Sequence, residues 1–160
     1  MLIATFVFSL VALTIFFDNW LSNQSNPNQN PDYSLSESGI KEVILQRNRQ
    51  GHYVAIGRIN EIPVTFLLDT GATDVAIPSN VAKKVGLERG VAHRALTANG
   101  IVTVFATTAG ELSIGNITLY NIDASITPSM PGDTILLGMS ALKKIEFTQK
   151  GASLTLRHLP

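Results

Sequence analysis

An aspartate directly follows three large apolar residues in the segment Phe66-Leu67-Leu68-Asp69-Thr70-Gly71. An unpaired carboxylate is costly to bury, so this aspartate must either be neutralised or have a function. Two carboxylates a few ångströms apart share one proton, and such a pair can activate a water molecule. The tripeptide Asp69-Thr70-Gly71 occurs once in the 160 residues, so one chain supplies only half of such a pair.

Two further motifs follow this one along the chain. In Thr97-Ala98-Asn99-Gly100, both Asn99 and Gly100 accept the left-handed conformation that a type I′ turn needs. We therefore expect a hairpin with its turn at these two residues, joining strands over 94–98 and 101–107. The second motif, Ile135-Leu136-Leu137-Gly138-Met139-Ser140-Ala141-Leu142, is typical of a buried strand that ends at a glycine.

The order and spacing of these motifs resemble those of the retropepsin-like (clan AA) aspartic proteases. The segment from about 53 to 157 is similar to a bacterial, membrane-anchored, single-domain subgroup. The resemblance implies an all-β fold, a closed retropepsin-like β-barrel with one or two short helices. It also implies a homodimer in which each subunit donates one aspartate. Thr73 and Met139 depart from the viral pattern, which has an acidic residue and an arginine at these places.

The resemblance also assigns roles to individual residues. Asp69 would be the catalytic carboxylate, with the Thr70 hydroxyl bonding across the two-fold axis and Gly71 allowing close approach of the backbone. Substrate-binding residues would come from the loop after this motif and from the hairpin, which would form a flap. They are Ala72, Thr73, Asp74, Ala98, Asn99 and Gly100.

Each role has a plainer alternative. For Asp69 the alternative is a cap on the following turn, since an aspartate at a strand end often has this role. For Asp74 the alternative is an ordinary solvated or helix-capping acid. The hairpin would be a plain surface hairpin. For Leu136-Leu137-Gly138 the resemblance implies support of the Asp69 loop from behind. The plainer alternative is a buried strand before a glycine turn, and the two interpretations nearly coincide.

Charge and cysteine content exclude several classes of function. Twelve basic and twelve acidic residues cancel, so nothing indicates a nucleic-acid-binding surface. The absence of cysteine excludes disulfides, thiolate catalysis and cysteine-based zinc sites. The three histidines, His52, His93 and His158, show no metal-ligand spacing. We expect neither a metal nor an organic cofactor.

The N-terminal segment 1–21 predicts a transmembrane anchor. Residues 2–17 carry no charge, and Trp20 follows as an interfacial residue. A cleaved signal peptide is the main alternative, but no Lys or Arg precedes Lys41 and no Ala-x-Ala site lies near Asp18. A buried core helix is the third interpretation. The family resemblance implies a single-pass protein of the cell membrane, with the protease domain periplasmic or otherwise outside the cytoplasm.

Residues 22–39 are rich in Ser, Asn, Gln and Pro and contain few apolar side chains. Such a composition predicts a flexible polar linker, because it cannot bury enough apolar surface to fold. A tether of this kind would raise the effective concentration of copies on one membrane.

Residues 40–160 predict one domain of short strands. Asn60-Glu61 separates two strands, and because Glu61 is a poor residue for a tight turn we expect a longer connection there. Helices are expected over 79–85, with Ser79 as N-cap, and over 140–144. The expected strands cover 43–46, 53–59, 62–68, 101–108, 111–114, 118–126, 134–137 and 153–156.

These features predict an aspartic endopeptidase that hydrolyses peptide bonds with water activated by two Asp69 residues across a homodimer. The expected partners are a peptide or protein substrate, a second copy of the chain and a membrane. A different class of function remains open: a non-catalytic, membrane-tethered module of the same fold that binds peptides or only dimerises.

Overall fold

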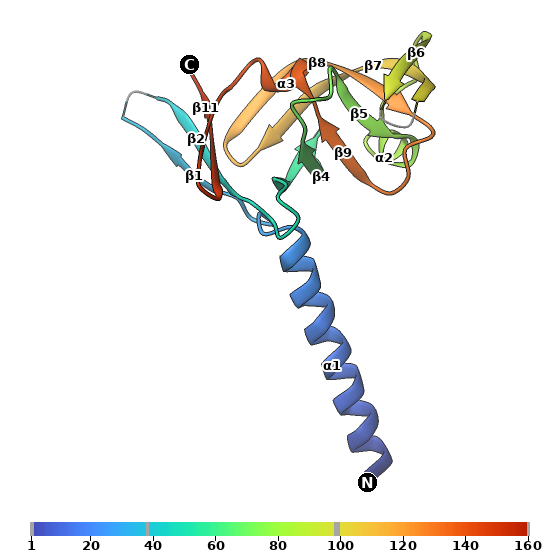
Figure 1. Ribbon diagram of the computed structural model, residues 1–160, viewed down its shortest axis with the longest axis vertical. Coiled ribbons are helices and arrows are strands. Elements are labelled where there is room, and N and C mark those ends of the chain that lie inside the picture. Colours follow the sequence, from blue (N-terminus) through green and yellow to red (C-terminus); the bar gives the residue numbers. More distant parts are fainter. Residues whose placement is uncertain (1, 38, 98–99, 160) are drawn as a thin grey trace.

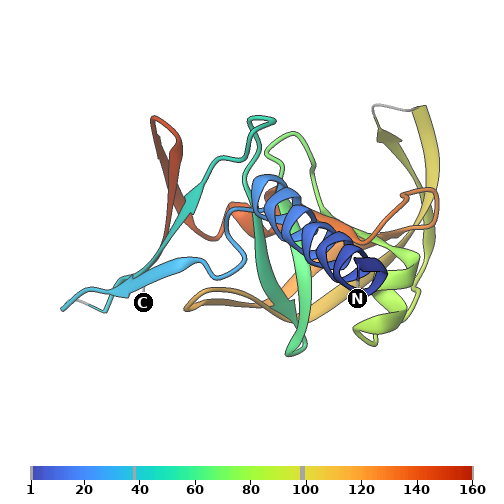
Figure 2. The same ribbon diagram turned by 90° about the horizontal axis from the view of Figure 1, so that it is seen from below.

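The protein consists of one long helix and a domain built almost entirely of strands (Figure 1). The computed structural model describes residues 2–37, 39–97 and 100–159. Helix α1 (Leu2–Ser25) projects away from the domain. Seen from below, it lies between the sheet that contains β1 on one side and the β6–β7 hairpin on the other (Figure 2).

The described strands form two sheets, of which the larger has the order β3-β4-β9-β5-β8-β7-β6. Its strands are β3 (Val54–Ile59), β4 (Ile62–Leu68), β5 (Val75–Pro78), β6 (Ala92–Thr97), β7 (Gly100–Ile114), β8 (Ile117–Thr127) and β9 (Thr134–Leu137). An additional pairing of β3 with β7, at Arg58–Ser113 and Ile59–Leu112, closes this sheet on itself. The predicted closed β-barrel is therefore confirmed.

The smaller sheet has the order β1-β2-β11-β10. Its strands are β1 (Asp32–Leu35), β2 (Lys41–Gln46), β10 (Glu146–Lys150) and β11 (Ser153–His158). All three pairings are antiparallel. The inner positions alternate along β2 and β11, and they continue the apolar core of the barrel, as expected for a sheet with one buried face. The fully buried side chains of both sheets include Val43, Leu45, Phe66, Ile77, Ile122, Ile135, Leu137 and Leu156.

Two short helices complete the domain, as predicted. Helix α2 (Ser79–Lys84) follows Pro78, which occupies the N-cap position that we assigned to Ser79. Proline fixes φ near the helical value, so it starts the helix without a side-chain hydrogen bond. Helix α3 (Met139–Leu142) begins one residue earlier than expected, directly after Gly138.

The connection between β3 and β4 is tighter than we expected. Ile59 pairs with Ile62, which leaves a two-residue turn at Asn60 and Glu61 with φ of 48° and 66°. The Asn60 amide donates to the carbonyl of Val85, and its oxygen accepts from the backbone N–H of Glu111. These long-range bonds stabilise a turn that the two residues alone do not favour.

Much of the segment predicted as a flexible linker makes hydrogen bonds to the domain in the structure. Helix α1 extends to Ser25, and β1 pairs with β2. Asn28 is only 3% exposed, and its side chain bonds the N–H and C=O of Gln46 and the C=O of Val54. Asn48 donates to the C=O of Ser25. These asparagines bond backbone groups, which needs no apolar surface, so the composition argument for a flexible linker did not anticipate these contacts.

Most predicted strands are present in the structure. The differences lie where tertiary contacts determine whether a segment forms a strand and where it ends. The expected strands over 101–108 and 111–114 form one strand, β7, which continues through Gly110. The short strands β1, β5 and β10 were not predicted. In the β6–β7 hairpin, Thr97 pairs with Gly100. Gly100 is therefore the first residue of β7 rather than a turn residue as predicted, and Ala98 and Asn99 lie outside the described residues.

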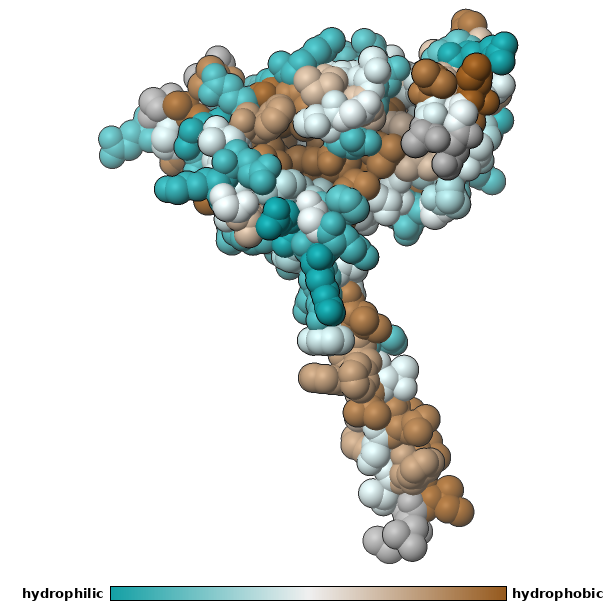
Figure 3. Space-filling view, in the orientation of Figure 1, coloured by the Kyte–Doolittle hydropathy of each residue, from teal (hydrophilic) through white to brown (hydrophobic). Residues whose placement is uncertain are grey.

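Helix α1 is the one helix in the described part of the chain that is long and apolar enough to cross a membrane. Its segment Ile3–Ser25 has a mean hydropathy of 1.6, and none of it is buried against the domain. Apolar side chains cover the helix, whereas much of the domain surface is hydrophilic (Figure 3). An exposed apolar helix of 24 residues fits a bilayer core.

Candidate active site

Asp69 is the first residue after β4, at the start of an exposed loop. Its backbone N–H donates to the carbonyl of Leu137 at 3.1 Å, which extends the parallel pairing of β4 with β9. One carboxylate oxygen, Oδ1, accepts from the N–H of Gly71 at 2.9 Å. Asp69 is partly buried rather than fully buried.

The predicted support from behind the Asp69 loop is present in the structure. The N–H of Met139 donates to the carbonyl of Ala72 at 2.8 Å, and the N–H of Ser140 donates to the carbonyl of Thr73 at 2.8 Å. Gly138 lies so close that a Cβ there would overlap the carbonyl oxygen of Asp74. Any side chain at this position would displace the loop, which explains why the motif ends in glycine.

Ser140 is a site residue that sequence reasoning did not single out. It is 7% exposed, and its hydroxyl donates to the carbonyl of Asp123 at 2.7 Å while accepting from the N–H of Val75 at 3.0 Å. One side chain therefore ties the end of the Asp69 loop to α3 and β8. A serine directly after a Gly-Met pair gives no local signal of this role, because both partners are distant in sequence.

The predicted substrate residues lie in two places. Thr70, Gly71 and Thr73 are exposed on the loop, and Ala72 and Asp74 are partly buried. Gly100 begins the second strand of the β6–β7 hairpin, whereas Ala98 and Asn99 lie outside the described residues. The structure thus gives a position to seven of the nine residues proposed for the site.

Asp74 borders an open cavity of about 530 Å³ between the Asp69 loop, β8 and the base of the β6–β7 hairpin. Ser125, which is 6% exposed, donates to Asp74 Oδ2 at 3.3 Å. Asp74 is therefore held toward β8 and does not cap a helix. The Arg89 guanidinium lies 4.8 Å from the ring centre of Phe105 and forms another part of the wall. Asp69 is not among the residues that line this cavity.

Within the described residues, no three His, Asp or Glu side chains gather closely enough to hold a metal ion. The site offers one carboxylate on a braced loop, exposed backbone groups beside it and a neighbouring polar cavity. A carboxylate in such a place can accept or donate a proton and can hold a water molecule. Acid and base roles at one time would require a second group beside this carboxylate.

Comparison with known proteins agrees with this geometry. Residues 55–144 match the family model described as "gag-polyprotein putative aspartyl protease". The fold is similar to the crystal structure of a retropepsin-like aspartic protease from Rickettsia conorii. The two share 26% identity and a TM-score of 0.61, over 79% of this chain and 95% of that one.

Two curated relatives are uncharacterized proteins. One, encoded in the region 5′ of cobV in Sinorhizobium sp, is 34% identical over 114 residues, which cover 69% of this chain and 49% of the relative. The other, from Rickettsia prowazekii (strain Madrid E), is 28% identical over 132 residues, covering 72% of this chain and 50% of the relative. The chain thus spans about half the length of these relatives. With more than half of its residues matched by the family model and with the barrel closed as described, the chain belongs to the retropepsin-like aspartic protease family.

Proposed function

We propose that the protein is an aspartic endopeptidase whose active site forms when two copies bring their Asp69 residues together. The observation that carries this proposal is the Asp69 carboxylate itself. It stands partly exposed at the start of a loop that Leu137, Met139 and Ser140 hold from behind. A catalytic group must be fixed in position and still reach solvent, and this loop meets both requirements.

The chemistry follows from placing two carboxylates around one water molecule. One Asp69, ionised, takes a proton from the water, while the protonated Asp69 of the partner subunit donates a proton to the oxygen of the scissile carbonyl. The pair titrates as one unit. Thr70 and Gly71 would hold the two loops together and let the substrate backbone approach.

The substrate is a peptide or protein segment bound in extended form. Ala72, Thr73 and Asp74 would contact it from the barrel side, and Ala98, Asn99 and Gly100 would close over it as a flap. An extended segment gains its affinity from main-chain hydrogen bonds. The position of the β6–β7 hairpin supports this role, since β6 is mostly exposed and lies at the end of its sheet.

We further propose that residues 1–21 anchor the protein in the cell membrane and that residues 40–160 form the protease domain outside the cytoplasm. The exposed apolar surface of α1 supports the anchor. Residues 22–39 would then connect the two parts as an ordered junction.

The decisive experiment compares the full chain with its Asp69→Asn variant in detergent. Both would be incubated with a denatured casein pool, and the products would be mapped by mass spectrometry. We expect the variant to lose activity by at least about 100-fold, the usual contribution of a general acid–base group. Asp133→Asn, an exposed aspartate on another loop, is the matched control and should cleave normally. Cleavage that persists in Asp69→Asn would refute the mechanism, and binding without cleavage would favour the peptide-binding module.

A further inference from the structure

The turn formed by residues 47–52 lies where α1 meets the domain. Asn48 is 7% exposed, and its side-chain amide donates to the carbonyl of Ser25 at 2.9 Å. The side-chain oxygen of Asn48 accepts two N–H groups of the same turn. On the surface, Arg49 Nη1 donates to the side chain of Gln24 at 3.1 Å. These bonds fix the turn against the last residues of the helix.

The place of this turn along α1 corresponds to the level of lipid headgroups. Residues 2–17 carry no charge, and Trp20 lies at the end of the apolar segment that would fill the bilayer core. Gln24 follows Trp20 by about one helical turn, which places it about 6 Å further from the core. The headgroup layer is roughly 5–8 Å thick on each side of a bilayer. Arg49, which contacts Gln24, therefore lies within reach of lipid phosphates when α1 spans a membrane.

Both segments that meet at this junction lack acidic residues. No Asp or Glu occurs in residues 19–31 or in residues 43–60. The second stretch contains three arginines, of which Arg47 and Arg49 belong to the turn. Because the charges of the whole chain cancel, this junction is a local concentration of positive charge.

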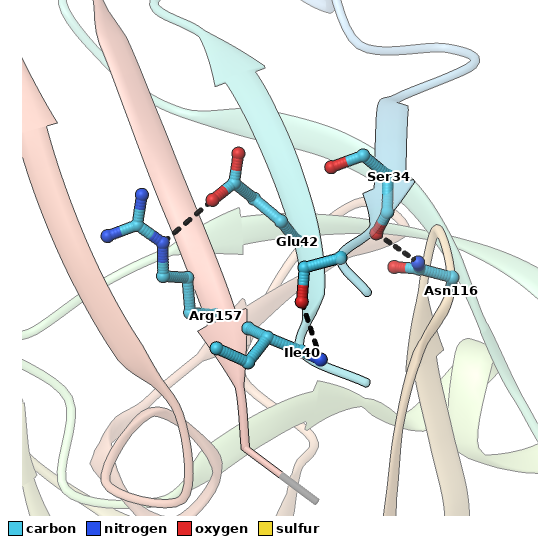
Figure 4. Close-up of polar contacts among 6 residues, drawn as sticks. Ser34, Ile40, Glu42, Asn116 and Arg157 are labelled. Carbon is cyan, nitrogen blue, oxygen red and sulfur yellow. Dashed lines mark hydrogen bonds and ion pairs between the residues drawn. The ribbon is translucent and has the colours of Figure 1, made fainter. Parts of the chain in front are cut away.

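Neither arginine of the turn is neutralised by the domain. Both residues are exposed, and the one ion pair among the described residues joins Arg157 to Glu42 on the smaller sheet (Figure 4). Arg49 uses one guanidinium nitrogen for the uncharged side chain on α1. The N–H of Arg47 donates to the carbonyl of Ala152 at 2.8 Å, which holds its backbone against the β10–β11 turn. Both positive charges are thus left without an acidic partner in the described part of the chain.

Two guanidinium groups held at this level suit the phosphates of a lipid bilayer. A guanidinium presents a planar fork of N–H donors that fits phosphate oxygens, and it is more weakly hydrated than an ammonium group. Each Arg or Lys close to an anionic membrane surface strengthens binding by a factor of about 5. A bilayer that holds α1 also holds its phosphates beside the turn, whereas a soluble phosphate ion has no such constraint.

From these observations we infer that the turn 47–52 is a membrane-contact surface, on which Arg47 and Arg49 bind the phosphate groups of anionic lipids. The inference rests on the proposed anchor, since the turn reaches the headgroups only if α1 spans a bilayer. It gives the domain a second attachment beside the helix. A contact on one side of α1 favours one direction of tilt, so anionic lipids hold that side of the domain against the membrane.

Chemical modification tests this contact in the unaltered full chain. The protein would be placed in nanodiscs of phosphatidylcholine, with or without phosphatidylglycerol, and treated with phenylglyoxal, which modifies accessible guanidinium groups. Mass spectrometry would give the rate at each arginine. We expect Arg47 and Arg49 to react about 5-fold more slowly in the anionic discs. Arg58 and Arg94, exposed on β3 and β6, are internal controls and should react equally in both.

Two outcomes of this experiment would overturn the inference. Equal rates at Arg47 and Arg49 in the two kinds of disc would show that anionic lipid does not cover them. An equal slowing of all four arginines would show a general effect of anionic discs on the reagent.

Detergent micelles separate a bilayer from a free anion as the source of phosphate. In maltoside micelles, which contain no phosphate, Arg47 and Arg49 should react quickly, and added inorganic phosphate should not protect them. Protection by inorganic phosphate equal to that in the anionic discs would assign the turn to a soluble anion and contradict the membrane contact.

A pair of substitutions tests whether the two charges hold the turn at the membrane. The chain has no cysteine, so Gln50→Cys provides a single position for a fluorophore that nitroxide-labelled headgroups quench. Added phosphatidylglycerol should increase quenching, and Arg47→Gln with Arg49→Gln should abolish this response. Arg58→Gln with Arg94→Gln removes the same charge elsewhere and should keep it. An equal response in the two double variants would contradict the role of the turn.

Trp20 provides a separate measurement for the anchor. It is the one tryptophan in the chain, so its quenching by brominated lipids reports whether the end of α1 lies in the bilayer. Quenched Trp20 with unprotected turn arginines would leave the anchor in place and refute the lipid contact. Unquenched Trp20 would refute the anchor and the contact with it. Neither measurement depends on casein cleavage, so the peptidase is tested independently.

Discussion

The Asp69 loop and the β6–β7 hairpin form two sides of the proposed cleft, but they are held very differently. The loop is bonded along its length to Leu137, Met139 and Ser140, and it packs against Gly138. The hairpin is at the end of its sheet: β6 pairs only with β7 among the described strands, and Leu96 is 84% exposed. This difference separates a fixed side that can position a reacting group from a side that can open and close.

The largest expected effect comes from Gly138→Ala, which would displace the Asp69 loop. The new methyl group would overlap the carbonyl oxygen of Asp74 and lie 2.7 Å from that of Ala72. We expect the free energy of unfolding to fall by about 3 kcal/mol, as for a severe overpacking change, with loss of peptidase activity. Urea unfolding followed by circular dichroism measures the first, and casein cleavage the second.

Gly132→Ala is the matched control for this change. Unlike Gly138, Gly132 has open space around it, but its φ is 79°, so the substitution strains the backbone without touching the loop. It should cost about 1 kcal/mol and leave activity intact. Equal losses in the two variants would show that the packing of Gly138 against the loop has no special role.

A smaller effect is expected from Ser140→Ala, which removes one bond from each of two backbone groups. The N–H of Val75 and the carbonyl of Asp123 would lose their Ser140 partner, at a cost of about 2 kcal/mol in unfolding free energy. Amide hydrogen exchange should show faster exchange at Val75 and unchanged exchange in β2. Ser140→Thr keeps the hydroxyl and should restore most of the protection; slow exchange at Val75 in the alanine variant would contradict the bracing role.

The smallest effect on stability is expected in the β6–β7 hairpin. Leu96→Ser changes an exposed residue of the hairpin and should alter the unfolding free energy by less than about 0.5 kcal/mol. If the hairpin covers bound peptide, KM should nevertheless rise several-fold. Tyr120→Ser, another exposed apolar residue, serves as the control and should change neither quantity. A large loss of stability in Leu96→Ser would mean that the two sides do not differ as described.

Sequence reasoning was most accurate where a short motif determines its own geometry. Asp69 at a strand end and the strand that ends at Gly138 follow from local patterns, and an all-β domain with short helices follows from strand periodicity. The closed barrel and the place of Gly138 behind the loop are what the family resemblance implies. It failed where distant residues decide the outcome. Ser140 acts through Asp123 and Val75, and the turn at Asn60 depends on Val85 and Glu111. No window of neighbouring residues contains these partners.

The same reason applies to residues 22–39, where the prediction of a flexible linker did not anticipate the bonds that the structure shows. Low apolar content indicates that a segment cannot fold alone, but it gives no information on bonds made to an existing sheet. Asn28 donates to the carbonyls of Gln46 on β2 and Val54 on β3, so its position depends on both strands. Short strands such as β10 have too few residues for a recognisable period, so their place in the sheet also depends on the rest of the domain.

The junction at Asn28 and Asn48 also has a mechanical consequence. Because these hydrogen bonds hold the end of α1 against the domain, a tilt of α1 would turn the domain with it. For a helix seated in a bilayer, the thickness of the hydrocarbon layer sets that tilt. If α1 spans a membrane and two copies associate, as proposed, lipid composition would change the angle at which the two domains approach each other.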